Sequence, residues 1–137
     1  MDSFICKSEK ATMDLARKMG EKAKPGDIIC LKGELGAGKT HFVKGFVTAF
    51  GISPEAVSSP TFSIIQEYSG TLPVYHFDFY RLENVQEALE IGSEEYFYGE
   101  GVSIIEWPER VEAILPEDVK QIHIASINRS TRKITIT

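Results

Sequence analysis

A glycine-rich octapeptide between an apolar run and an amphipathic segment constrains the fold of this chain more than any other feature. Residues 33–40 read GELGAGKT and match the pattern G-x-x-x-x-G-K-[ST] in full. The run before it, residues 28–31, is continuously apolar and of strand length, which is typical of a strand covered on both faces. The segment after it has apolar side chains on one helical face, namely Val43, Phe46, Val47 and Phe50. This strand–loop–helix order predicts a phosphate-binding loop, or P-loop.

Each residue type of this loop has a physical role in binding a nucleoside triphosphate. Glycines let the backbone fold around the phosphates with its N–H groups pointing inward, and the helix N-terminus adds partial positive charge. Lys39 offers a mobile charge to the β- and γ-phosphates, and the Thr40 hydroxyl can bind Mg²⁺. The loop therefore predicts a bound nucleoside triphosphate with Mg²⁺. The expected nucleotide contacts in and beside the loop are Glu34, Leu35, Gly36, Ala37, Gly38, Lys39, Thr40 and His41.

A P-loop needs an acidic partner at the end of a neighbouring strand, and two residues fit this requirement. Asp78 ends the run VYHFD, and Glu106 ends the run VSIIE. Either residue would place a carboxylate at the C-terminal edge of the sheet, where open α/β sheets bind ligands. Thr61, between the loop and Asp78, is a candidate switch residue that senses the γ-phosphate. His76 has two interpretations, of which a hydrogen-bonded core histidine is favoured over a catalyst.

Alternation of strand-like and helix-like segments predicts a layered α/β fold. No repeat or linker interrupts residues 1–137, so we expect a single domain. Ser8 and Asn84 are expected to cap helices. The expected strands are residues 4–6, 28–31, 63–68, 72–80 and 102–106, with a C-terminal pair at 121–127 and 133–137.

Charge is distributed unevenly along a chain whose net charge is -5. Residues 83–118 contain eleven acidic residues and one base, Arg110, so this segment carries -10. We call it the acidic segment. Its charge argues against broad nucleic-acid binding by this chain. It is either a solvated helical face or a docking surface for a basic protein. No run is long enough to span a membrane and no secretory signal is present. The two cysteines fit a reducing compartment, so a cytoplasmic location is expected.

Five segments together resemble the TsaE family, also called YjeE, of bacterial P-loop ATPases needed for threonylcarbamoyladenosine formation in tRNA. The resemblance covers roughly residues 8–125. It is carried by GELGAGKT (33–40), SSPTFSIIQEY (58–68), YHFDFYRLE (75–83), EALEIGSEEYF (87–97) and IIEWPER (104–110). The P-loop alone is generic, whereas the HFDFYRL and EWPER segments in this order are specific.

The resemblance implies a P-loop NTPase-like three-layer sandwich with a mixed, largely parallel central sheet flanked by helices and a C-terminal β-hairpin. It implies ATP binding with Thr40 and Glu106 as Mg²⁺ ligands, and a switch formed by Asp78 and the segment containing Thr61. It also implies nucleotide contacts from Glu9 and from either Arg129 or Arg132. The family acts with the TsaD and TsaB proteins, which transfer the threonylcarbamoyl group, so this chain would meet tRNA only indirectly.

One position departs from the family pattern, because His41 stands where a second Thr or Ser is common. The backbone N–H toward the α-phosphate remains, but a hydroxyl contact is lost. Two other functions stay open at this point: a small P-loop kinase, and a nucleotide-gated binding module. The absence of any Lys or Arg between Arg81 and Arg110 disfavours the kinase, whose lid usually carries arginines. The same absence predicts weak ATPase activity alone and activation by partners.

Overall fold

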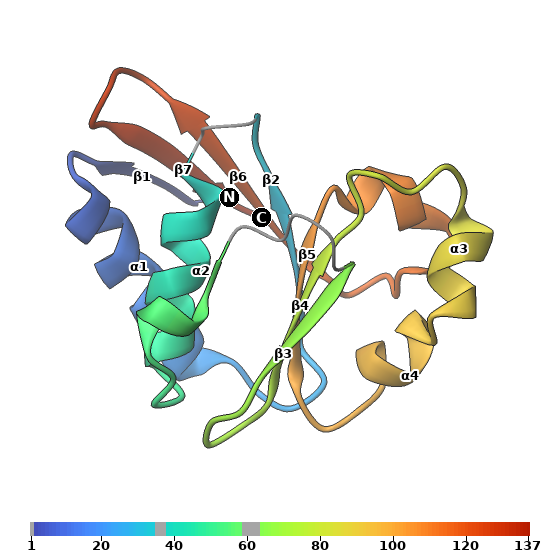
Figure 1. Ribbon diagram of the computed structural model, residues 1–137. Helices are drawn as coiled ribbons and strands as arrows, with labels where there is room; N and C mark the ends of the chain where they lie inside the picture. Colours follow the sequence, from blue (N-terminus) through green and yellow to red (C-terminus); the bar gives the residue numbers. More distant parts are fainter. Residues whose placement is uncertain (1, 35–37, 59–63) are drawn as a thin grey trace.

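The computed structural model describes residues 2–34, 38–58 and 64–137 (Figure 1). The predicted contact residues Leu35, Gly36, Ala37 and Thr61 lie outside the described residues. The strands are β1 (Asp2–Cys6), β2 (Ile28–Lys32), β3 (Ile65–Tyr68), β4 (Val74–Asp78), β5 (Val102–Glu106), β6 (Lys120–Ser126) and β7 (Arg132–Ile136). The helices are α1 (Glu9–Lys22), α2 (Lys39–Thr48), α3 (Val85–Glu90) and α4 (Ser93–Phe97), with the 3₁₀ segments η1 (Pro54–Ala56) and η2 (Pro108–Ile114).

One mixed sheet forms the centre of the molecule, and the described residues give it seven strands in the order β1-β7-β6-β2-β5-β4-β3. The four central strands, β6, β2, β5 and β4, run parallel to one another. The outer strands β3, β7 and β1 pair antiparallel with their neighbours. The carboxyl ends of the parallel strands therefore meet at one edge of the sheet, which is the edge where the glycine-rich loop leaves β2.

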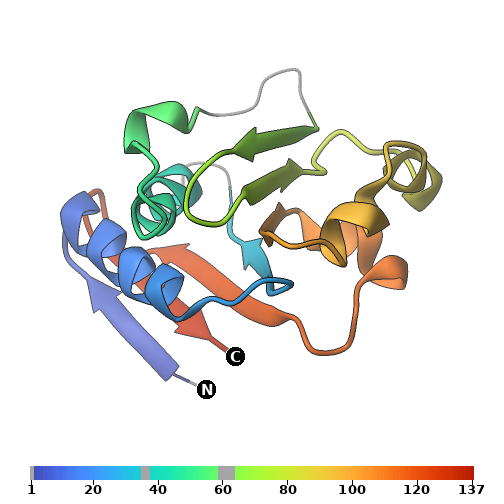
Figure 2. The ribbon, with the colours of Figure 1, turned by 90° about the horizontal axis from the view of Figure 1, so that it is seen from below.

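Helices cover both faces of the sheet, as predicted for a three-layer α/β fold. α1 and α2 lie on one face, while α3, α4 and η2 lie on the other (Figures 1 and 2). α1 and α2 approach each other so closely at Gly45 that a Cβ atom there would clash with the Met13 carbonyl oxygen. β2 is buried almost throughout between the two layers, which explains its continuous apolar sequence.

Local signals in the sequence specify several element boundaries. Ser8 caps α1 by accepting a hydrogen bond from the Ala11 N–H at 3.0 Å, and Asn84 caps α3 through the Glu87 N–H at 3.2 Å, as predicted. β3 and β4 are shorter than the predicted 63–68 and 72–80. The pairing of β1 with β7 was not predicted; it brings Asp2 opposite Ile136 at the far edge of the sheet. Within the described ranges, no helix is long and apolar enough to cross a membrane.

Candidate functional site

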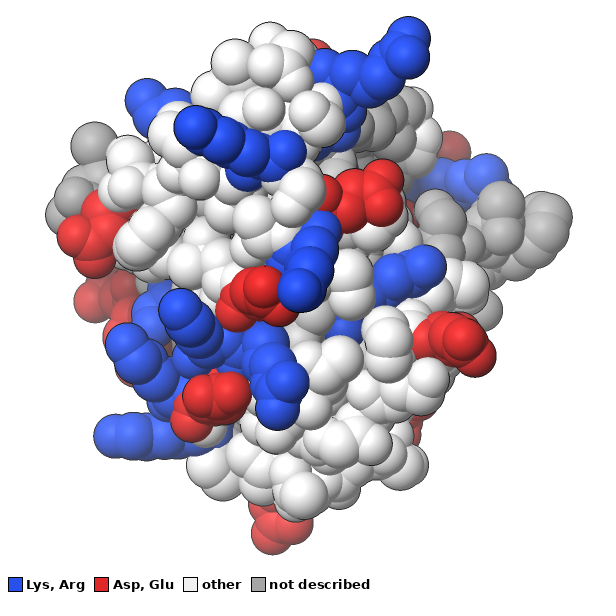
Figure 3. All heavy atoms as spheres, turned by 90° about the vertical axis from the view of Figure 1, so that its left-hand side faces the viewer, with Lys and Arg blue, Asp and Glu red and all other residues white. Residues whose placement is uncertain are grey.

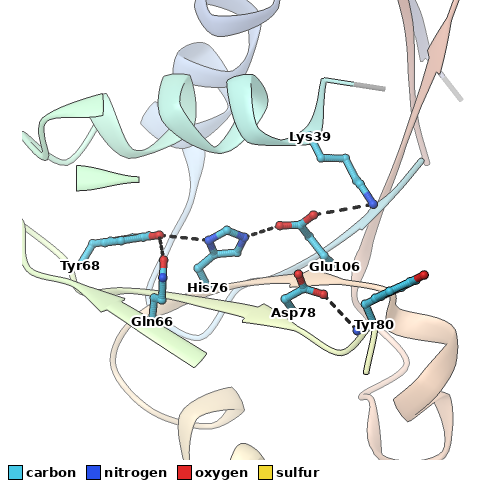
Figure 4. Close-up of polar contacts among 7 residues, drawn as sticks. All are labelled: Lys39, Gln66, Tyr68, His76, Asp78, Tyr80 and Glu106. Carbon is cyan, nitrogen blue, oxygen red and sulfur yellow. Dashed lines mark hydrogen bonds and ion pairs between the residues drawn. The ribbon is translucent and has the colours of Figure 1, made fainter. Parts of the chain in front are cut away.

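Three adjacent strands bring the predicted site residues to one sheet edge. β2 leads into the glycine-rich loop, Glu106 ends β5, and Asp78 ends β4. Because β5 lies between β2 and β4, Glu106 lies close to the loop and directly opposite Asp78 in the strand register. The predicted location of both carboxylates at the C-terminal edge is therefore confirmed, and Glu106 is the nearer of the two to the loop lysine in Figure 4.

Lys39 and Glu106 form a buried ion pair at the start of α2. The Lys39 Nζ lies 3.7 Å from Glu106 Oε1, and each residue is only 7% exposed. The same Nζ lies 4.6 Å from the centre of the Trp107 ring, within the range of a cation–π contact. Trp107 reaches this position with a left-handed backbone (φ 59°), and its ring packs against Tyr80 at 4.9 Å. The lysine ammonium is thus placed beside both a carboxylate and an aromatic face.

The second oxygen of Glu106 belongs to a buried chain of polar side chains from three strands (Figure 4). Glu106 Oε2 accepts a hydrogen bond from His76 Nε2 at 2.5 Å. On the other side of the imidazole ring, Nδ1 lies 3.1 Å from the Tyr68 hydroxyl, and this hydroxyl donates to Gln66 Oε1. The favoured interpretation of His76, a core histidine with satisfied hydrogen bonds, agrees with this geometry, and its partner is a site residue.

Asp78 is half-buried beside the pair. Its Oδ1 accepts a hydrogen bond from the Tyr80 N–H at 3.0 Å. Burial raises the pKa of the Asp78 carboxyl above its ordinary value, because the charged form loses hydration. The Tyr80 N–H and the Lys39 ammonium oppose this shift, while the Glu106 carboxylate adds to it. Keeping Asp78 charged at neutral pH therefore lowers the free energy of unfolding.

We expect Asp78→Asn to raise stability at neutral pH. A carboxyl whose folded pKa lies above its unfolded value stabilises the fold only below the unfolded pKa, and this contribution is lost as pH rises through the folded pKa. Asparagine keeps the oxygen that accepts from Tyr80 and removes the charge. Urea unfolding should therefore give a higher midpoint for the variant at pH 7 and equal midpoints near pH ~3, below the usual Asp pKa. A midpoint difference that is the same at both pH values would contradict a raised pKa for Asp78. Asp14→Asn, on the exposed side of α1, is the control.

Three further predicted contact residues lie around the head of α2. Glu9 Oε2 lies 3.4 Å from His41 Nε2, so the start of α1 and the first turn of α2 meet through this pair. The side chain of Arg132, in β7, lies against Gly38. A Cβ atom added at Gly38 would be 3.2 Å from the Arg132 Nε. Gly38 itself adopts φ 102°, a conformation that favours glycine. Of the two candidate arginines, Arg132 is thus the one beside the described end of the loop.

The donor set at this edge suits a hard cation such as Mg²⁺. Glu106 and Asp78 bring carboxylate oxygens to this edge, and Thr40, the second residue of α2, brings a hydroxyl oxygen. Mg²⁺ prefers such oxygen ligands and usually keeps several waters, so a full protein cage is not required. Consistent with this, the described part of the chain contains no group of three or more His, Cys, Asp or Glu side chains arranged as a metal cage. Glu34 is exposed at the entry to the loop.

Sequence reasoning missed Tyr68, Gln66 and the contact between Trp107 and Lys39. Tyr68 and Gln66 lie within a strand that was predicted, and their period-two spacing places both on one face. The missing information was the register of β3 against β4, which pairs Gln66 with His76. The left-handed conformation of Trp107 had no sequence signal.

This fold, with the glycine-rich loop between its buried strand and α2, defines an α/β protein of the P-loop kind. A family model described as "Threonylcarbamoyl adenosine biosynthesis protein TsaE" matches residues 6–134. The protein named tRNA threonylcarbamoyladenosine biosynthesis protein TsaE from Bacillus subtilis is 46% identical over 127 residues, covering 92% of this chain and 78% of that protein. The protein of the same name from Treponema pallidum is 39% identical over 132 residues, covering 96% and 97%.

A solved structure agrees with these sequence matches. The crystal structure of YdiB from Bacillus subtilis superposes with a TM-score of 0.81 at 38% identity, covering 98% of this chain and 83% of that chain. The chain belongs to the TsaE family of threonylcarbamoyladenosine biosynthesis proteins, which confirms the resemblance seen in its sequence.

Proposed function

We propose that this chain is the ATP-binding and ATP-hydrolysing subunit of the cytoplasmic machinery that forms threonylcarbamoyladenosine at position 37 of tRNA. The observation that carries the proposal is the buried Lys39–Glu106 pair, which joins the P-loop lysine to the carboxylate of the neighbouring strand across 3.7 Å. A buried cation and a buried carboxylate at the head of a helix are the groups that a phosphate chain and its metal ion require.

Each site residue has a proposed task. Lys39 binds the β- and γ-phosphates, and Thr40 with Glu106 holds Mg²⁺, which when bound neutralises phosphate charge during hydrolysis. Asp78 and Thr61 act near the γ-phosphate. The remaining nucleotide contacts come from Glu9, His41, Arg132 and the loop residues 34–38.

The site is open to solvent along part of its rim. The Glu9 side chain is 74% exposed, Tyr80 is 44% exposed, and Glu34 is also exposed. Fast phosphoryl transfer usually needs a shielded site with positive charge held on the transition state. The proposed consequence is slow hydrolysis by the isolated chain and faster turnover when a partner covers the site.

The proposed partners are the TsaD and TsaB proteins, with tRNA contacted indirectly. The acidic segment contains α3, α4 and η2, which lie on the right of Figure 1, and the buried strand β5 in the centre of the sheet. Of the three consecutive aromatic residues in this segment, Tyr96, Phe97 and Tyr98, only Tyr98 is well exposed, at 67%, whereas Phe97 is buried and Tyr96 packs against Tyr75. A docking contact on this side would therefore use Tyr98 together with the surrounding carboxylates.

The opposite side of the molecule differs in charge. The face seen in Figure 3, on the left of Figure 1, carries Lys and Arg side chains with Asp and Glu among them. The mixed charge of this face contrasts with the acidic segment, whose net charge is -10. A basic partner surface would be steered to the acidic segment, and such steering weakens with ionic strength.

The proposed function predicts partner-dependent and salt-sensitive ATPase activity. Steady-state turnover should be slow for the pure chain and should rise at least about tenfold with TsaD and TsaB, which is a barrier reduction of about 1.4 kcal/mol. The rise should shrink as salt is increased from low to high concentration. Fast turnover by the chain alone, unchanged by partners, would contradict the proposal and favour a stand-alone ATPase or kinase. Tyr98→Ser should reduce the activation, and Ile127→Ser, an exposed apolar position away from the acidic segment, is the control.

A further inference from the structure

We propose that His76 and Tyr68 position the Glu106 carboxylate for Mg²⁺, so that the metal affinity of the site depends on a buried chain of hydrogen bonds from the edge strand β3. The inference rests on the proposed function, because it concerns the same Mg²⁺-nucleotide site. It assigns a task to two residues that touch neither nucleotide nor metal. His76 and Tyr68 are thus positioning residues rather than catalytic residues.

Both oxygens of the Glu106 carboxylate are held by neighbouring side chains. Oε2 accepts from His76 Nε2 at 2.5 Å, and Oε1 lies 3.7 Å from the Lys39 Nζ. A carboxylate fixed at two points keeps one orientation, whereas a carboxylate held at one point can rotate. Because a metal ion takes its ligands in a defined geometry, the second contact determines how much of the metal's affinity is realised.

His76 is in turn held by its second nitrogen. The ring is only 2% exposed, and the Tyr68 hydroxyl lies 3.1 Å from Nδ1. The Tyr68 ring lies 6.1 Å from the imidazole, and its hydroxyl is anchored by a hydrogen bond to Gln66. An imidazole with partners at both nitrogens has a fixed ring plane, here with Nε2 facing Glu106 and Nδ1 facing the Tyr68 hydroxyl.

The sheet register makes this arrangement specific. Gln66 is directly opposite His76, and Tyr68 is opposite Val74, so Tyr68 is the diagonal neighbour of His76 on the same face. On the other side, His76 is opposite Ile104, and Glu106 is two residues further along β5. The polar chain therefore crosses three adjacent strands on one otherwise apolar face, the one covered by α1 and α2.

Burial makes an incomplete version of this hydrogen-bond chain costly to the folded state. His76, Tyr68 and Glu106 are each less than a tenth exposed, and a buried polar group costs free energy unless all of its partners are present. An apolar residue at position 76 would extend the core without that requirement. The chain of hydrogen bonds ends at the Glu106 carboxylate, which is at the proposed metal site. The buried polar groups are therefore paired at the place where the orientation of a metal ligand matters.

The test measures nucleotide affinity by calorimetry in the presence of Mg²⁺ and in the presence of EDTA, for the full chain and four variants. His76→Leu removes the donor to Glu106, and we expect the gain in affinity caused by Mg²⁺ to fall about ten- to a hundred-fold, the usual effect of losing such an orienting partner. Affinity in EDTA should change little. His76→Gln should restore part of the gain, because its amide nitrogen reaches about as far as Nε2.

Tyr68→Phe keeps the ring and removes only the hydroxyl, so it should reduce the Mg²⁺ gain less than His76→Leu. Tyr75→Phe is the matched control on β4, since the Tyr75 hydroxyl is not part of this chain of hydrogen bonds. The Tyr75→Phe variant should behave as the unmodified protein. Thermal unfolding in the absence of nucleotide shows whether each variant is folded. If His76→Leu fails to fold, Tyr68→Phe and His76→Gln decide the question on their own.

The outcomes separate this inference from the proposed function. If the unmodified chain shows no Mg²⁺-dependent nucleotide affinity, the proposed function itself is wrong. If the unmodified chain shows this dependence and the folded His76 and Tyr68 variants keep all of it, the positioning role is wrong. A selective loss of the Mg²⁺ gain, with the partial rescue by glutamine, supports the inference.

Discussion

Replacement of Lys39 by alanine should abolish tight ATP binding. In the proposed function the ammonium is the cation that contacts the β- and γ-phosphates, and it is already desolvated, since Lys39 is 7% exposed. Charge-assisted contacts of this kind contribute about 1.5–3 kcal/mol, which is roughly ten- to a hundred-fold in affinity. Calorimetric titration with ATP is the measurement.

A second cation of the same helix gives the control. Lys44 lies five residues further along α2, and Lys44→Ala should leave the affinity nearly unchanged. Removal of Lys39 also leaves Glu106 buried without its ion-pair partner, so the fold of the variant must be checked by thermal unfolding. A folded Lys39→Ala protein with unchanged affinity would contradict the assignment of the P-loop.

Glu106→Ala and Asp78→Ala should differ sharply in their effects. Glu106→Ala should lower ATP affinity about ten- to a hundred-fold in Mg²⁺ and much less in EDTA, because it removes the charged side chain that is proposed to bind the metal. Asp78→Ala should leave ATP binding largely intact and lower turnover in the complex with TsaD and TsaB. The structural basis is that Glu106 contacts Lys39, whereas Asp78 lies one strand further from the loop.

Paired titrations with and without Mg²⁺ distinguish these roles. Glu106→Gln is a second variant, since it keeps the side-chain volume and an oxygen that accepts from His76 while removing the charge. If Asp78→Ala loses Mg²⁺-dependent binding and Glu106→Ala does not, the roles of the two carboxylates are reversed.

Sequence alone was sufficient for the parts of the site that depend on local signals. The glycine-rich loop, the buried strand before it and the amphipathic helix after it are contiguous in the chain, so their order specified the loop. Glu106 and Asp78 were identified because each ends an apolar strand, and parallel strands place their ends together. The helix caps Ser8 and Asn84 needed no tertiary information either.

The parts that could not be predicted depend on pairing between distant segments. β1 lies beside β7 although Asp2 and Ile136 are at opposite ends of the described chain, and no local pattern specifies that choice. The hydrogen bonds of His76 depend on the register of β3 against β4 and of β4 against β5, and a slip of one residue would turn Tyr68 to the other face. Two neighbouring aromatic residues differ in burial, since Phe97 is buried and Tyr98 is exposed. This difference likewise follows from how α4 packs.

The strand order also bears on when the proposed nucleotide site can be completed during protein synthesis. Ile29 of β2 lies opposite Ile104 of β5 and Lys120 of β6, so both neighbours of the strand that leads into the P-loop are made long after it. A nascent chain that has reached the end of α2 has neither of these strands nor the Glu106 carboxylate, and non-local pairing of this kind is slow to form. The site proposed for Mg²⁺-ATP is therefore incomplete on a ribosome-bound chain until both β5 and β6 have been synthesised.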